Sequence, residues 1–123
     1  MPDTEMTSPD VTMKGKVQTV LGPIEPGQMG VTLTHEHLVI DLDGYFSQAE
    51  EASMRFYADR PVTMDILGKM GKLWFRNHAN LRVLDEQLAI KEALRFRHAG
   101  GDSMVDTTSI GIARDPLALT RIS

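Results

Sequence analysis

The sequence predicts an α/β protein built on a parallel sheet, and segments in alternating order carry this prediction. A strand-like run occupies Val31–Ile40 and a helix-like run occupies Asp85–Ala99. A second strand, Ser103–Thr107, then precedes the start of another helix, Pro116–Ile122. Strands that alternate with helices are typical of βα units that feed a parallel sheet. With 123 residues, the chain is at most one domain or a part of one.

Composition and charge exclude several classes of protein. The chain is 41% hydrophobic and 24% charged, as soluble globular proteins are, and its 13 basic residues are scattered among 17 acidic ones. A scattered basic set forms no stripe that could follow phosphates, so we expect no nucleic-acid partner. The lack of cysteine excludes disulfides, a thiolate nucleophile and a cysteine-rich zinc site, which leaves histidine and carboxylate as metal ligands.

Neither a membrane segment nor an export signal is found. No run of about 18 apolar residues could span a bilayer, and the N-terminus lacks the basic and apolar regions of a signal peptide. We therefore expect a cytoplasmic protein without a membrane partner. Residues 1–14 mix Pro, Asp, Ser and Thr without apolar periodicity, which predicts a disordered tail before a structured segment over residues 15–123.

A hairpin is expected directly after the tail. Lys16–Leu21 is β-branched and partly alternating, and the glycine- and proline-rich stretch GPIEPGQMG follows it, which predicts a strand, a turn and a return strand. Residues 41–80 show no sustained period, so we expect loops with short helices near Gln48–Ala58 and Thr63–Leu73. Within this segment, Trp74 and Phe75 are interpreted as core residues, with a cover over the mouth of a larger barrel as the alternative.

The pair His35 and His37 is the strongest chemical feature of the sequence. Residues separated by one position project from the same face of a strand, and two neutral imidazoles there could grip one metal ion. A histidine pair that packs or forms hydrogen bonds remains the alternative from the residues alone. The residues predicted to share this strand face are Val31, Leu33, His35, His37 and Val39.

The two predicted helices have clear ends. Asp85–Ala99 begins with acidic residues and ends with basic ones before two glycines, which suits the helix dipole and a helix stop. Asp115 stands before Pro116 as an N-cap residue, with Arg114 free to pair locally.

Three further polar residues are candidates for a functional role. Asp106 ends the second strand and could be a base or a ligand, but a carboxylate there more often binds loop amides. His78 is placed in a loop and His98 at a helix end, and neither is assigned to a metal.

Two dense blocks resemble the phosphotriesterase family of the amidohydrolase superfamily. They are QTVLGPIEPGQMGVTLTHEHLVID and HAGGDSMVDTTSIGIARDPLALTRIS, and the resemblance covers about Gly15 to Ser123. It implies a TIM (β/α)8 barrel, of which this chain would be the N-terminal part: a hairpin plus the first two βα units. It also implies a two-metal centre in which His35 and His37 bind the more buried ion. Ala113 stands where the family usually has glycine, at a cost of roughly 1 kcal/mol if φ is positive there.

The resemblance implies a metal-dependent hydrolase that uses two Zn²⁺ ions in its complete site. Such an enzyme cleaves ester, lactone, phosphoester or amide bonds of a small-molecule substrate through a metal-bound hydroxide. The family's bridging carboxylate, later histidines and aspartate have no matching positions here, and a barrel needs about 250 residues. We therefore expect a truncated barrel that is inactive alone. The alternative is a non-catalytic truncated product that is inactive or depends on a partner chain.

Overall fold

The computed structural model describes residues 13–123, which form a mixed α/β chain with three two-stranded sheets. The strands are β1 (Val17–Thr19), β2 (Gly22–Ile24), β3 (Thr32–Glu36), β4 (Ile40–Asp41), β5 (Arg82–Val83) and β6 (Ser103–Asp106). The α-helices are α1 (Ala52–Arg55), α2 (Met64–Leu67), α3 (Met70–Leu73), α4 (His78–Leu81), α5 (Glu86–His98) and α6 (Pro116–Ile122). Short 3-10 turns are η2 (Pro26–Gln28), η3 (Asp43–Tyr45), η4 (Trp74–Arg76) and η5 (Ile110–Ile112).

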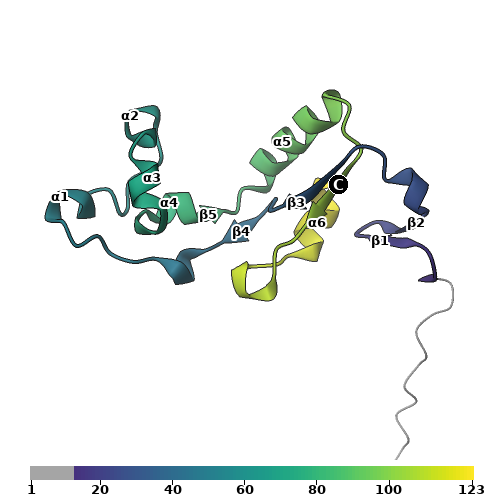
Figure 1. Ribbon diagram of the computed structural model, residues 1–123, viewed down its shortest axis with the longest axis horizontal. Helices are drawn as coiled ribbons and strands as arrows, with labels where there is room; N and C mark the ends of the chain where they lie inside the picture. The colour runs from purple at the N-terminus through teal and green to yellow at the C-terminus, as the bar shows by residue number, and fades with distance from the viewer. Residues whose placement is uncertain (1–12) are drawn as a thin grey trace, which may run out of the picture.

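The chain extends to both sides of a central strand pair. Figure 1 shows the β1–β2 hairpin on one side of β3 and β6, and the short helices α1 to α4 on the other. Residues 1–12 of the predicted tail lie outside the described residues, and Met13 opens a turn in which its carbonyl oxygen accepts from the Lys16 amide at 3.1 Å. Among residues 13–123, no helix is both long and apolar enough to cross a bilayer.

The predicted hairpin is confirmed, although its first strand is shorter than Lys16–Leu21. β1 pairs antiparallel with β2, and Val17 lies opposite Ile24. Gly22 turns the chain with a φ of 121°, a conformation that residues with a Cβ rarely adopt. At the open end of the hairpin, the Lys16 ammonium lies 2.9 Å from the Glu25 carboxylate.

β3 and β6 form the parallel pair that the sequence predicts. Leu33 lies opposite Met104, and the register then shifts so that Glu36 lies opposite Asp106. Between these two pairs, β3 contains one more residue than β6, which is typical of a β-bulge. Among the described residues, neither strand pairs with a third strand.

Asp102 fastens the start of β3 to the end of α5. Its carboxylate accepts from the Val31 amide at 3.0 Å and from the Arg97 guanidinium at 2.6 Å. The Val31 amide, followed by Arg97, holds the pKa of Asp102 below its ordinary value. Gly30 makes room for this contact, because a Cβ on it would lie 2.3 Å from Asp102 Oδ2.

The predicted strand Val31–Ile40 is wrong beyond Glu36. β3 ends at that residue, and Ile40 instead pairs antiparallel with Val83 in the β4–β5 sheet. Between the two strands, the Leu38 amide donates to the Asp106 carboxylate and not to a ladder partner. A side-chain acceptor thus ends the strand pairing, and the single face predicted for Val31, Leu33, His35, His37 and Val39 is divided, since Val39 is buried while Val31 and Leu33 are exposed.

Short helices fill the segment between β4 and β5, but they are shorter than predicted. α1 occupies four residues within Gln48–Ala58, while α2 and α3 both lie within Thr63–Leu73. Ile66, Met70 and Leu73 form a small apolar core there. An α-helix of four residues gains little by itself, so these helices depend on tertiary contacts.

Two side-chain predictions in this segment are wrong. Trp74 and Phe75 are not core residues, because 60% and 41% of their surfaces are exposed. Leu73 fills the core position beside them and leaves both aromatic rings outside. His78 lies at the start of α4 and not in a loop, because the Asn77 side chain caps this helix by accepting from the Asn80 amide.

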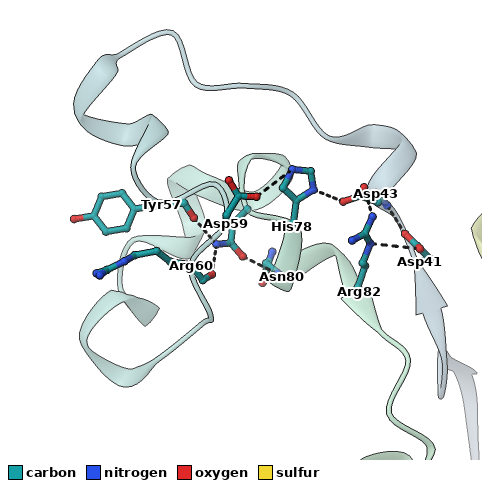
Figure 2. Close-up of polar contacts among 9 residues, drawn as sticks. Asp41, Asp43, Tyr57, Asp59, Arg60, His78, Asn80 and Arg82 are labelled. Atoms are coloured by element: carbon teal, nitrogen blue, oxygen red, sulfur yellow. Dashed lines mark hydrogen bonds and ion pairs between the residues drawn. The ribbon is translucent and has the colours of Figure 1, made fainter.

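A cluster of charged side chains holds this segment to the β4–β5 sheet. Figure 2 shows the Asp43 carboxylate between His78 and Arg82, to both of which it bonds. Arg82 Nε lies 3.5 Å from Asp41 Oδ2, and the His78 ring stacks on Phe46 with centroids 3.8 Å apart. The cluster therefore joins α4, β4 and β5 at one point.

Asn77 is the best-buried polar side chain of the segment, with 0% of its surface exposed. Its amide nitrogen donates to the carbonyl oxygens of Tyr57 and Arg60 at 2.6 and 2.8 Å. Its amide oxygen accepts from the Asn80 amide at 2.7 Å. Asn77 thus gives a donor to the Arg60 carbonyl oxygen and a second, shorter hydrogen bond to the Tyr57 carbonyl oxygen, which also accepts from the Arg60 amide at 3.3 Å.

Both predicted helices form, and Asp115 is the N-cap that the sequence predicts, whereas Asp85, predicted as the first helical residue, is the N-cap of α5. The Asp85 carboxylate accepts from the amides of Gln87 and Leu88 at 2.9 and 3.1 Å, and Asp115 accepts from Ala118 at 2.9 Å. α5 ends at His98, one residue before the predicted end at Ala99, and the predicted stop follows at Gly100, which has a φ of 95°.

α5 and α6 pack together over the second apolar core. Val39, Ala89, Ala118 and Ile122 form this core. The Arg121 guanidinium bonds both oxygens of Glu86 at 2.6 and 2.8 Å and thereby lowers the pKa of Glu86. Since this core is small, many apolar side chains stay outside it, and an open groove runs between the hairpin, α5, β6 and α6.

Replacing Ala113 with glycine is expected to stabilise the protein. Ala113 has a φ of 69° and a ψ of 43°, in the left-handed region where alanine is strained by roughly 1–2 kcal/mol. The greater freedom of glycine in the unfolded chain offsets part of this relief, so we expect the free energy of unfolding to rise by about 1 kcal/mol in urea denaturation. Ala99→Gly, at a φ of −79°, is the matched control and should stabilise nothing. Equal changes in the free energy of unfolding for the two variants would contradict the claim that Ala113 is strained.

Asn77→Asp is expected to destabilise the protein by about 2–4 kcal/mol in urea denaturation at neutral pH. The substitution keeps the acceptor for Asn80 but removes the side-chain donor from both carbonyl oxygens and buries a carboxylate. The Tyr57 carbonyl oxygen then keeps only the Arg60 amide, at 3.3 Å. Asn80→Asp, at an exposed side chain, is the control and should cost less than about 1 kcal/mol. Similar losses for the two variants would show that Asn77 does not anchor the segment.

Candidate metal centre

Two histidines meet at the carboxyl end of β3. His35 is the second-last residue of β3, and His37 directly follows the last residue of the strand, Glu36. Their ring centroids are 5.3 Å apart, and the ring planes are inclined by 77°. His35 is exposed and His37 is half-buried. The structure thus brings the two predicted residues together at the edge where parallel α/β sheets build their active sites.

The backbone after β3 is held against the backbone after β6. The Thr107 amide donates to the Glu36 carbonyl oxygen at 2.9 Å, one residue beyond the last paired residue of β6. This bond extends the parallel ladder to the position directly before His37. The His37 side chain is consequently positioned by the neighbouring strand as well as by its own.

Asp106 links the two chain segments that follow β3 and β6. Its Oδ2 atom accepts from the Leu38 amide at 2.9 Å, and its Oδ1 atom accepts from the Thr108 amide at 2.9 Å. The structural interpretation of Asp106 is therefore confirmed, because each carboxylate oxygen binds a loop amide. A carboxylate bonded in this way makes charge-assisted hydrogen bonds, which are stronger than neutral ones.

Thr108 is the residue of this site that the sequence analysis missed. Its side chain is 2% exposed, and its Oγ1 atom lies 2.9 Å from His37 Nδ1 and 3.4 Å from the Val39 carbonyl oxygen. The Arg114 guanidinium donates to the Thr108 carbonyl oxygen at 2.9 Å, so Arg114 pairs locally as predicted. One signal in the sequence could have indicated Thr108. It comes shortly after the second parallel strand, and residues that follow neighbouring parallel strands meet at the same edge of the sheet.

The donor set offers two positions to a divalent cation. Neutral imidazole nitrogens are ordinary ligands of Zn²⁺, and the hydrogen bond at His37 Nδ1 leaves the Nε2 atom of that ring available. Within residues 13–123, no group of three or more His, Cys, Asp or Glu side chains is arranged to hold a metal ion. The described part of the chain therefore fits half of a tetrahedral coordination sphere.

The other histidines lie elsewhere in the fold. His78 bonds to Asp43 and lies 3.9 Å from the Asp59 carboxylate, so both its ring nitrogens face acidic groups of the charged cluster (Figure 2). His98 is the last residue of α5. The predicted position of His98 at a helix end is confirmed, whereas His78 lies in the charged cluster at the start of α4 and not in a loop.

Comparisons with known proteins agree over nearly all of the described chain. The profile of the phosphotriesterase family matches residues 15–123. An N-acetyltaurine hydrolase from Salmo salar is 42% identical over 113 residues, which make up 90% of this chain and 32% of that protein. A phosphotriesterase-related protein from Nematostella vectensis is 38% identical over 112 residues, or 89% of this chain and 32% of that protein.

A solved structure agrees with the sequence comparisons. The crystal structure of a resiniferatoxin-binding protein from Rhodobacter sphaeroides matches with a TM-score of 0.85 and 39% identity, over 88% of this chain and 30% of that one. The chain thus spans about a third of the length of the relatives that it matches. Because the family profile covers residues 15–123 and relatives in sequence and structure cover the same region, the chain belongs to the phosphotriesterase family.

Proposed function

We propose that this chain supplies the first two βα units of a metal-dependent hydrolase, in which His35 and His37 bind a divalent cation. The observation that carries the proposal is the convergence of these two imidazoles, 5.3 Å apart, at the carboxyl end of β3 beside β6. In a (β/α)8 barrel, β3 and β6 would be the first two barrel strands, and their carboxyl ends would line the active site.

Zn²⁺ is the cation that suits this donor set best, because imidazole nitrogens bind zinc well and the chain has no thiolate to offer. When bound, such an ion supplies Lewis-acid activation of water and of the carbonyl or phosphoryl oxygen under attack. Two imidazoles leave the coordination sphere incomplete, so we propose that the remaining ligands and a second ion belong to further βα units. Membership of a family whose relatives are about three times as long supports this proposal.

We propose an amide of a small carboxylic acid as the first substrate class to test. The relatives named N-acetyltaurine hydrolase, at 42% identity in Salmo salar and 37% in Homo sapiens, cover nine-tenths of this chain. Ester, lactone and phosphoester bonds are the other bonds that a metal-activated water could cleave. In barrel enzymes the loops after later strands select among such substrates, and the described residues contribute only the first two of these loops.

Substitution of either histidine is expected to abolish hydrolysis by the protein expressed from its complete reading frame. We expect His35→Asn and His37→Asn to lower kcat/KM for N-acetyltaurine by at least about 100-fold, because loss of a ligand should exceed the 10–100-fold cost of losing its hydrogen-bond partner. Zinc content per protein, from elemental analysis, should fall in parallel. His98→Asn, at the end of α5, is the matched control and should keep both activity and zinc.

Two results would contradict the proposed function. One is a histidine variant that loses zinc but hydrolyses its substrate at the wild-type rate. The other is rapid zinc- or manganese-dependent turnover by residues 1–123 alone, since two ligands should not suffice for a working centre. If the complete protein binds no metal and hydrolyses none of the four bond types, the non-catalytic alternative replaces the proposal.

A further inference from the structure

We propose that Thr108 is a positioning residue that fixes the tautomer of His37, so that the Nε2 atom of this imidazole carries the lone pair that binds the metal ion. The inference rests on the proposed function, because it concerns one of the two proposed ligands. Thr108 follows the second parallel strand, β6, and acts on a proposed ligand that follows the first, β3.

Two groups lie within hydrogen-bond distance of the Thr108 hydroxyl, and we assign its hydrogen to the one that can only accept. A threonine hydroxyl has one hydrogen to donate and two lone pairs with which to accept. The Val39 carbonyl oxygen, 3.4 Å from Oγ1, can only accept, so we assign the hydroxyl hydrogen to this long contact. Toward His37 Nδ1, at 2.9 Å, the hydroxyl must then accept, which requires that Nδ1 carry a hydrogen. A neutral imidazole with Nδ1–H has its free lone pair on Nε2.

Thr108 is held firmly enough to impose this arrangement. Its amide donates to Asp106 at 2.9 Å and its carbonyl oxygen accepts from Arg114 at 2.9 Å, so the backbone is fixed on both sides of the side chain. Only 2% of the residue is exposed, which leaves little room for water to replace the hydroxyl. Ligand histidines in metalloproteins commonly donate their second ring nitrogen to such an acceptor, which fixes tautomer and ring orientation.

The test uses long-range ¹H–¹⁵N NMR correlations of the histidine side chains in the metal-free protein expressed from its complete reading frame, at a pH well above the ordinary pKa of histidine. The expected result for the wild type is the Nδ1–H tautomer at His37. Thr108→Val keeps the side-chain shape but removes the hydroxyl, and it should shift His37 toward the Nε2–H tautomer. Titration with Zn²⁺ alone, followed through the same signals, should give an affinity about 10-fold lower in this variant.

Two further variants separate positioning from structure. Thr108→Ser retains the hydroxyl and should restore both the tautomer and the affinity for Zn²⁺. Thr107→Val makes the same substitution at the neighbouring residue, whose hydroxyl lies 3.5 Å from the Glu36 carbonyl oxygen, and should leave the His37 signals unchanged.

Three results would overturn the proposal: an Nε2–H tautomer in the wild type, an unchanged tautomer in Thr108→Val, or equal zinc affinities in the wild type and that variant. If Thr108→Val fails to fold, the wild-type tautomer and the Thr108→Ser comparison still decide the question. A wild type that shows the Nδ1–H tautomer but binds Zn²⁺ away from His35 and His37 would refute the proposed function and leave the tautomer result standing.

Discussion

The Asp106 carboxylate is the contact on which the arrangement of the candidate site depends. Its two oxygens accept from the Leu38 and Thr108 amides, one in each of the segments that follow the parallel strands. Leu38 is the neighbour of His37, and Thr108 is the residue that contacts the His37 ring. A single side chain therefore sets the distance between a proposed ligand and its hydrogen-bond partner. It also ends the strand, because the Leu38 amide is no longer available for ladder pairing.

The β3–β6 edge is held by more contacts than the apolar cores of the chain provide. The β3–β6 edge is fixed by backbone pairing, by Asp102 at its start and by Asp106 at its end. In contrast, the apolar cores are two small clusters, and Leu33 and Val105 on the paired strands are each 38% exposed. Parallel sheets are normally covered on both faces. Exposed apolar side chains on β3 and β6 are therefore expected if, as proposed, further parts of a larger barrel cover these strands.

Local sequence signals predicted the elements whose ends are fixed locally. Asp85 and Asp115 cap their helices by hydrogen bonds to residues two or three positions on, so the sequence contains both partners. The H-x-H pair could be predicted because residues two positions apart on a strand share a face. The β4–β5 pairing joins Ile40 to Val83, the burial of Asn77 depends on two distant turns, and Thr108 meets His37 across the strand pair. Such contacts between residues far apart in sequence leave no periodic pattern in either segment, which is why they were missed.

The most direct test of the account is to locate zinc in crystals of the protein expressed from its complete reading frame, by anomalous diffraction at the zinc edge. The account predicts an anomalous peak about 2.0–2.1 Å from an imidazole nitrogen of both His35 and His37. A zinc peak at the His78 and Asp43 cluster with none at this pair, in crystals of protein that hydrolyses its substrate, would contradict it.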